Sequence, residues 1–213
     1  MSSSPARLTD ETLARGLRVL SASDPDLARI LDELGPPPVW AREPGFPTLV
    51  HIILEQQVSL ASARAAYDRL CSLVSPLTPE GFLALDDATL KAAGFSRQKT
   101  GYGRHLARAI VEGRLDLGAL ETMPDAAVRA ELCNLKGIGP WSAEIYLLMA
   151  LLRPDAWPVG DIALASAVRD VKGLAAPPAP AALEAIGAAW HPWRAVAARL
   201  LWHHYLSRRK PKA

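Results

Sequence analysis

The sequence has few of the features that mark secreted, membrane-spanning or cysteine-rich proteins. Its 213 residues include only 2 cysteines, Cys71 and Cys133, which lie far apart and form no Cys-x-x-Cys pair. This argues against a zinc or iron–sulfur site built from cysteines and fits a reducing compartment. No stretch approaches the roughly 18 uncharged apolar residues of a membrane span. The N-terminus, MSSSPARLTDE, lacks the apolar segment of a secretory signal, so we expect a cytoplasmic protein.

The alternating apolar pattern of β-strands is also missing, as are internal repeats and long low-complexity segments. Apolar residues recur instead at helical spacing, and proline or glycine residues separate the helical segments. With 50% hydrophobic and 22% charged residues, the composition is that of an ordinary globular protein. The pattern predicts an all-α fold of about ten helices. The predicted helical ranges are 10–20, 25–34, 47–73 with a break near 57–59, 79–85, 87–93, 99–112, 125–135, 141–152, 161–171, 180–189 and 192–206.

Acidic residues are absent from the C-terminal part of the chain, from Ala185 onward. In a chain whose net charge is only +2, a segment of one sign indicates a polyanionic partner. The alternative is a solvated basic tail. The basic residues of this segment are Arg194, Arg199, Arg208, Arg209, Lys210 and Lys212.

A glycine turn stands between two helical segments in the stretch LKGIGPWSAEI (135–145). Gly costs about 1 kcal/mol relative to Ala in a helix interior, so this turn needs something that glycine provides. Gly137 and Gly139 can adopt positive φ and expose their N–H groups, and the next helix directs its N-terminus at the turn. Together with Lys136, these groups could bind a phosphate of a nucleic acid. The alternative is a helix corner that needs glycine for geometry only; Ile138 should face inward in both cases.

The hairpin segment LKGIGPWSAE resembles the motif of the helix–hairpin–helix DNA glycosylases, which carry a Gly/Pro-rich loop and an aspartate after the hairpin. Here the loop Pro158-Val-Gly-Asp161 follows the hairpin by about 20 residues. More closely, the chain is similar to the 3-methyladenine DNA glycosylase II branch, which repairs alkylation damage. The N-terminal β-rich domain usual in that branch has no counterpart here. The similar segments are LVHIILEQQVSLASA (49–63), LKAAGFSRQKTGYGRHLARAIVEGRLDL (90–117), WHPWR (190–194) and LLWHHYL (200–206).

The resemblance implies two helical subdomains with an active-site cleft between them. Residues 10–46 and 158–206 would form one subdomain. Residues 47–157 would form the other and would carry the helix–hairpin–helix at about 130–152. Residues 1–9 are expected to be disordered, and residues 207–213 to form a basic tail.

Asp161 is the catalytic residue that the resemblance implies. From its position alone, Asp161 is a good N-cap for the helix that follows, and a helix N-terminus stabilises a carboxylate. Breaking an N-glycosidic bond develops positive charge on the sugar, which a nearby carboxylate can stabilise. The same group can orient or deprotonate the attacking water. The cap and the catalytic roles are therefore compatible.

Aromatic residues match the base pocket of the resembled branch at two positions. Trp141 and Trp202 could stack on a flipped, positively charged purine; the alternative is that both are core residues. Trp141 also stands where related backbone-cutting enzymes have a Schiff-base lysine, which implies a monofunctional enzyme that uses water. Ile145 and Ile162 replace tyrosines of the branch, which leaves the preferred base open.

Two glutamines follow the helical segment HIILE. The resemblance implies that Gln57 enters the duplex and fills the gap left by the flipped base, and that Gln56 contacts the pocket or the DNA backbone. The alternative is a polar helix end. The predicted DNA-binding set is Gln57, Lys136, Gly137, Ile138, Gly139 and Ser142.

We therefore expect a monomeric DNA glycosylase that removes alkylated purines of the 3-methyladenine and 7-methylguanine type from double-stranded DNA. It should leave an abasic site, lack lyase activity and require no cofactor, although the resemblance allows a monovalent cation on hairpin carbonyls. A metal site shared by His203 and His204 is not expected, because adjacent helical residues point in different directions. The Ala-, Arg- and Pro-rich composition suggests a bacterial source and hence the nucleoid.

Three other functions remain open from the sequence. One is a related glycosylase for deaminated or oxidised bases. Another is a non-catalytic helix–hairpin–helix DNA-binding protein, which has no need for Asp161. The third is a helical adaptor in which the tryptophans are core residues and the glycines form corners.

Overall fold

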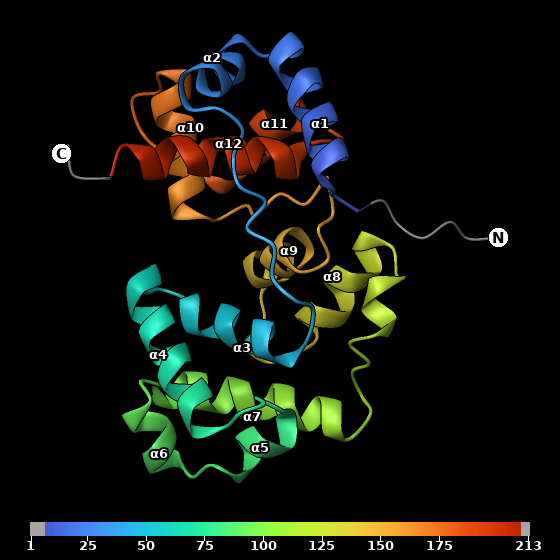
Figure 1. The fold of residues 1–213 in the computed structure, drawn as a ribbon, viewed down its shortest axis with the longest axis vertical. Coiled ribbons are helices and arrows are strands. Elements are labelled where there is room, and N and C mark those ends of the chain that lie inside the picture. The colour runs from blue at the N-terminus through green and yellow to red at the C-terminus, as the bar shows by residue number, and fades with distance from the viewer. Residues whose placement is uncertain (1–6, 210–213) are drawn as a thin grey trace. The chain divides into compact units, whose positions relative to one another are not determined.

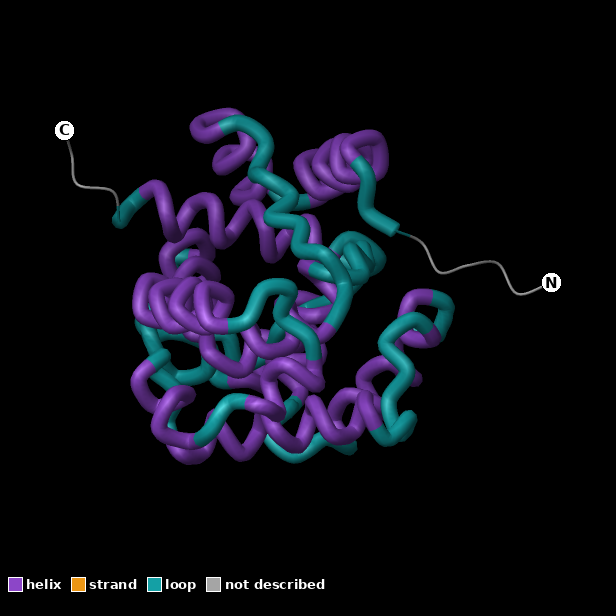
Figure 2. The backbone as a smooth tube through the Cα atoms, turned by 60° about the horizontal axis from the view of Figure 1, so that its bottom comes forward, coloured by secondary structure: helices purple, strands orange, loops and turns teal. Residues whose placement is uncertain are grey.

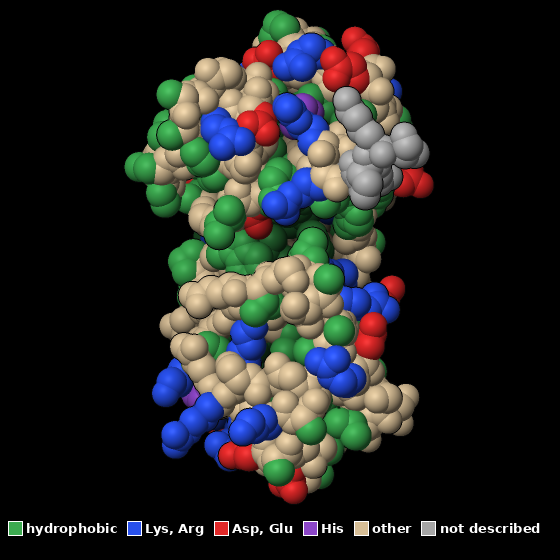
Figure 3. Space-filling model, turned by 90° about the vertical axis from the view of Figure 1, so that its left-hand side faces the viewer, with side chains coloured by type: hydrophobic (Ala, Val, Ile, Leu, Met, Phe, Trp, Pro, Cys, Tyr) green, Lys and Arg blue, Asp and Glu red, His purple; other side chains and the backbone are tan. Residues whose placement is uncertain are grey.

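The computed structural model describes residues 7–209 (Figure 1). This part of the chain contains twelve α-helices, one short 3-10 helix and no strand (Figure 2), which confirms the predicted all-α fold. None of these helices is long and apolar enough to cross a membrane. On the face shown in Figure 3, groups of Lys and Arg side chains alternate with apolar side chains.

The described chain divides into two compact units, residues 42–146 and residues 7–41 with 147–209. Compared with the expected subdomains, the first unit also includes residues 42–46, and the second unit also includes residues 147–157. Hydrogen bonds connect both segments to the units that contain them. Arg42 binds the carboxylate of Glu55 within the first unit, at 2.6 and 3.0 Å. Within the second unit, the N–H of Leu8 donates to the carbonyl of Leu152 (2.6 Å).

The first unit is built around α3, which packs against α4 and α7 (Figure 1). Leu49, Ile52 and Ile53 have no exposed surface, and α3 is apolar on nearly all sides, as expected for a helix inside a core. The predicted break near 57–59 is confirmed, because α3 ends at Glu55 and α4 begins at Leu60. The helices are α3 (Phe46–Glu55), α4 (Leu60–Leu73), α5 (Pro79–Ala84), α6 (Asp87–Ala92), α7 (Arg97–Val111), the 3-10 helix η1 (Ala119–Glu121), α8 (Asp125–Cys133) and the start of α9 (Pro140–Met149).

The second unit is built around α12, which packs against α1, α2 and α10. Val196, Leu200 and Leu201 are fully buried, so α12 is the central helix of this unit. Its remaining helices are α1 (Asp10–Ser23), α2 (Pro25–Leu34), α10 (Ile162–Lys172) and α11 (Pro180–Ala188), and α12 spans Arg194–Ser207.

The expected disordered N-terminus and basic tail fall largely outside the described residues, which exclude 1–6 and 210–213. Residues 8 and 9 of the N-terminal range are ordered, contrary to the expectation. Leu8 is buried, and the side chain of Thr9 accepts from the N–H of Thr12 to cap α1. At the other end, the guanidinium of Arg209 lies over the ring of Tyr205 (4.7 Å).

Candidate active site and nucleic-acid interface

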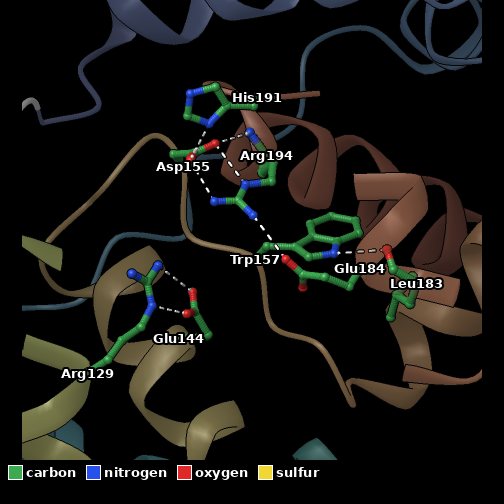
Figure 4. A network of polar contacts seen from close by, with 8 residues as sticks. All are labelled: Arg129, Glu144, Asp155, Trp157, Leu183, Glu184, His191 and Arg194. Atoms are coloured by element: carbon green, nitrogen blue, oxygen red, sulfur yellow. Dashed lines mark hydrogen bonds and ion pairs between the residues drawn. The ribbon is translucent and has the colours of Figure 1, made fainter. Parts of the chain in front are cut away.

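The hairpin consists of α8, the loop 134–139 and α9. Ile138 is 4% exposed and its N–H donates to the carbonyl of Leu135 (3.0 Å), so this side chain faces inward as predicted. An ion pair between Arg129 and Glu144 joins α8 to α9 (Figure 4). Lys136 is exposed in the loop just before α9. The hairpin therefore combines a fixed core, an exposed cation and a helix N-terminus whose first amides lack intrahelical acceptors.

The two hairpin glycines serve different purposes. Gly137 has φ +95°, and a Cβ there would overlap the ring of Tyr102. Gly139 does not adopt positive φ, so the prediction is confirmed for Gly137 and wrong for Gly139. The reason is that Gly139 directly precedes α9, where its carbonyl accepts from the N–H of Ala143 (3.0 Å). A Cβ on Gly139 would meet nothing within 4 Å, which leaves open space beside its backbone.

Gln56 ties the end of α3 to the hairpin. Its Nε2 donates to the carbonyl of Gly137 (2.8 Å) and to Oγ of Ser142 (3.0 Å). Ser142 is only 2% exposed. The side-chain nitrogen of Gln56 and the hydroxyl of Ser142 are thus engaged inside the first unit, and the DNA or base contacts predicted for both residues stay predictions.

Gln57 occupies the tip of the turn between α3 and α4. Its φ is +58°, a conformation that is uncommon for residues other than glycine, and its side chain is exposed. Val58 and Leu60 beside it are 46% and 63% exposed. Lys99 stabilises the residues just before this turn, because its Nζ donates to the carbonyl of Leu54 (2.7 Å). A fixed turn with a projecting side chain suits the predicted insertion into a duplex.

In the second unit, Asp161 caps α10 as predicted. Its Oδ1 accepts from the N–H of Leu164 (2.7 Å) and from Nε1 of Trp202 (3.1 Å). The N–H of Asp161 donates to the carbonyl of Pro158 (3.1 Å), which closes the Pro-Val-Gly-Asp turn. The carboxylate is therefore oriented by one backbone donor and one indole donor. The structure brings together two residues that the sequence selected separately, Asp161 and Trp202.

Trp202 is 7% exposed, and the ring of Trp40 packs against it edge to face, with centroids 6.5 Å apart and planes at 71°. Trp40 is not among the site residues predicted from the sequence. The only local signal was its position after the proline run 36–38.

The two isoleucines differ in their surroundings. Ile162 is 84% exposed and lines a shallow pocket of about 210 Å³ together with Asp161, Pro177 and Pro178. Ile145 is 3% exposed within α9, one turn after the half-buried Trp141. Of the predicted base-pocket residues, Ile162 and Trp202 belong with Asp161 to the second unit, whereas Trp141, Ile145 and Gln56 belong to the first.

The basic C-terminal segment is less available to a polyanion than the sequence suggested. Arg199 has no exposed surface; its guanidinium donates to the carbonyls of Val39 (2.8 Å), Ala195 (3.0 Å) and Leu148 (2.8 Å). Burial lowers the pKa of Arg199 to about 10.

Arg194 is bound to the carboxylate of Asp155 (2.7 Å) and to Glu184 (3.3 Å) (Figure 4). The exposed side chains that remain are Arg208 and Arg209, since Lys210 and Lys212 lie outside the described residues.

Within residues 7–209, no three His, Cys, Asp or Glu side chains are grouped so that they could hold a metal ion. The expectation that no cofactor is required stays a prediction. In the hairpin loop, the carbonyl of Gly137 already accepts from Gln56, and that of Leu135 accepts from Ile138. Each carbonyl oxygen has a second lone pair, so the loop is compatible with the monovalent cation that the resemblance allows.

Comparison with known proteins finds one matching family and several similar proteins. The model of the HhH-GPD superfamily of base excision DNA repair proteins matches residues 50–192. A DNA-3-methyladenine glycosidase from Bacillus halodurans is 30% identical in sequence, with a TM-score of 0.75 and 91% of each chain covered. A 3-methyladenine DNA glycosylase from Schizosaccharomyces pombe, solved with abasic DNA, is 25% identical, with a TM-score of 0.84 and with 88% of this chain and 95% of that chain covered.

A Bacillus subtilis protein provisionally named as a DNA-3-methyladenine glycosylase is 28% identical over 188 residues. That match covers 84% of this chain and 66% of the B. subtilis protein. The family match extends over more than half of the chain and includes both the hairpin and Asp161. The chain therefore belongs to the HhH-GPD superfamily of base excision DNA repair proteins.

Proposed function

We propose that the protein is a monofunctional DNA glycosylase that hydrolyses the N-glycosidic bond of alkylated purines in double-stranded DNA. The observation that carries this proposal is the carboxylate of Asp161, oriented at the N-terminus of α10 by the N–H of Leu164 and the indole of Trp202. The relatives' names support the substrate class, because they describe 3-methyladenine glycosylases, one of them bound to abasic DNA.

The reaction follows from the charge that develops as the bond breaks. When the C1′–N bond of the flipped nucleotide breaks, its electron pair goes to the alkylated purine, which leaves as a neutral base. The positive charge that remains on the sugar is stabilised by the carboxylate of Asp161. Water then forms the C1′–O bond, and Asp161 takes the proton that the water releases. The products are the free base and an abasic site.

The positive charge of an N-alkylated purine explains why this site needs no strong general acid. The base already carries the charge that protonation would supply, so the site has mainly to accept an electron-poor ring. An indole face serves this purpose, since a cation above it gains about 0.5–2 kcal/mol. In our proposal Trp202 and Trp141 supply such faces, and the absence of a lysine at position 141 removes the amine that a Schiff base would require.

In our proposal, the first unit binds the DNA backbone. The exposed Lys136, the open backbone at Gly139 and the N-terminus of α9 suit a phosphate group. Gln57, on its fixed left-handed turn, would fill the gap that the flipped base leaves behind. Membership of a DNA repair family implies a compartment that contains DNA; a bacterial nucleoid and a monomeric state are part of the proposal.

The test is to incubate the protein with labelled duplexes that contain 7-methylguanine, hypoxanthine or 8-oxoguanine. We expect strand breaks at 7-methylguanine that appear only after hot alkali, and no covalent DNA adduct after borohydride treatment. Breaks without alkali, or a borohydride-trapped adduct, would contradict a monofunctional enzyme. Preference for hypoxanthine or 8-oxoguanine would favour the related glycosylases that Ile145 and Ile162 leave open. Salt-sensitive binding with no base release would indicate a DNA-binding module.

A further inference from the structure

Trp40 has a backbone conformation that a bulky side chain rarely adopts. It lies in the segment between α2 and α3, and its φ is +50°. Non-glycine residues in this region are uncommon, and an aromatic one persists only where surrounding contacts hold it there. Such outliers gather at functional sites, so the contacts that hold Trp40 and the groups that it faces bear on function.

A buried cation holds the segment in place. Nε of Arg199 donates to the carbonyl of Val39, the residue directly before Trp40 (2.8 Å). Arg199 is itself fixed by the carbonyls of Ala195 and Leu148, and it is fully buried. The positive φ of Trp40 is thus held by an anchor that cannot move without removing the donor from the carbonyls of Val39 and Leu148.

The indole of Trp40 packs against the residue that orients the catalytic carboxylate. Its ring meets that of Trp202 at 71° with centroids 6.5 Å apart, and Nε1 of Trp202 donates to Asp161. Two indoles in this arrangement form a corner rather than a parallel stack, so a planar ring could lie on one and meet the edge of the other.

Trp40 also differs from Trp190, a core tryptophan of the same unit. Trp190 is 2% exposed and its Nε1 donates to Asp24 (2.8 Å). Trp40 is only half-buried, and none of the hydrogen bonds found among residues 7–209 involves its indole N–H. Part of the Trp40 ring and its donor are therefore left for a ligand.

We propose that Trp40 is a specificity-determining residue that contacts the flipped base and forms an aromatic wall beside Trp202. The inference rests on the proposed function and deepens it. Position 162, where the resembled branch has a tyrosine, carries an isoleucine. In the proposed site, Trp40 supplies this missing aromatic surface, although it comes from a different part of the chain. The ligand that suits it is a positively charged N-alkylpurine, which gains from an indole face.

The test compares Trp40→Phe with Trp40→Leu, because both side chains fill space and only one has a π-face. We would measure single-turnover excision of 7-methylguanine and, separately, affinity for abasic DNA, in which no base occupies the pocket. Trp40→Leu should lower the excision rate by about 3- to 30-fold, whereas Trp40→Phe should retain most of it. Both variants should bind abasic DNA within about twofold of the wild type.

Tyr205→Leu is the matched control. Tyr205 is a half-buried aromatic residue on α12, the helix that carries Trp202, and its ring is covered by Arg209. Its replacement should leave excision unchanged.

Equal excision by Trp40→Phe, Trp40→Leu and the wild type would overturn the role of Trp40 and leave the proposed function intact. So would a parallel loss of excision and of abasic-DNA affinity in both variants, together with a lower melting temperature, because that pattern marks a purely structural residue. A wild-type protein that releases no base from any duplex would overturn both proposals.

Discussion

Nε1 of Trp202 donates to Oδ1 of Asp161 at 3.1 Å, which links the central helix α12 to the N-terminus of α10. Through this bond, the packing of α12 decides where the carboxylate points. The same oxygen also accepts from the N–H of Leu164, so the carboxylate is held by a backbone donor as well. A residue that would otherwise be an ordinary helix cap is thereby held in one orientation.

Trp202→Phe keeps an aromatic ring and removes this donor. We expect excision of 7-methylguanine to fall by about 10- to 150-fold, because a hydrogen bond to a charged group contributes about 1.5–3 kcal/mol. The variant should still fold, since Phe fills most of the same space. Single-turnover kinetics and a thermal melt would check this; excision at the wild-type rate would show that the indole donor does not matter.

The two hairpin glycines allow a paired test. Gly137→Ala should lower the free energy of unfolding by at least about 2 kcal/mol, because it combines positive φ with an overlap with Tyr102. Gly139→Ala should unfold like the wild type, since its Cβ would enter open space, but should bind DNA more weakly. Urea unfolding and DNA titration at fixed salt would be compared for both variants. Unchanged DNA affinity in Gly139→Ala would remove the open backbone from the phosphate site.

Gln57 can be tested with two small replacements that differ in backbone preference. Gln57→Ala and Gln57→Gly should both weaken binding to abasic DNA and slow excision, because neither can fill the gap in the duplex. Gln57→Gly should nevertheless be about 1 kcal/mol more stable than Gln57→Ala, since φ is +58° at this position. If both variants bind abasic DNA like the wild type, Gln57 is not the inserted residue.

Arg199→Met should be among the most destabilising substitutions in the second unit. It removes the side-chain donor of the Val39 and Leu148 carbonyls, and each buried acceptor left without a partner costs about 1–3 kcal/mol. Arg29→Met is the control, because Arg29 is half exposed and its ion pairs with Asp26 and Glu33 should contribute less than about 1 kcal/mol. Similar melting temperatures for the two variants would contradict the anchoring role of Arg199.

The local features of the fold could be predicted from the sequence. Helical periodicity gave the all-α class, and Asp161 could be recognised as the cap of α10 because capping depends on a few adjacent residues. The inward position of Ile138 and the break near Gln57 follow from local rules of the same kind.

The sequence could not predict contacts that depend on packing between distant segments. Trp40 meets Trp202 only because α12 lies at the centre of the second unit. For the same reason Arg199, which the charge pattern assigned to a basic surface, is buried among backbone carbonyls. Gly139 was expected to resemble Gly137 because the two stand in the same turn; their difference depends on where α9 begins.

The most direct test of the account is Asp161→Asn. Asn keeps the size of the side chain and can still cap a helix, so this variant should fold and bind abasic DNA like the wild type. It lacks the charge that stabilises the developing sugar cation, so we expect single-turnover excision of 7-methylguanine to fall by at least about 100-fold. Excision by Asp161→Asn at a rate close to that of the wild type would contradict the central claim that this carboxylate carries the reaction.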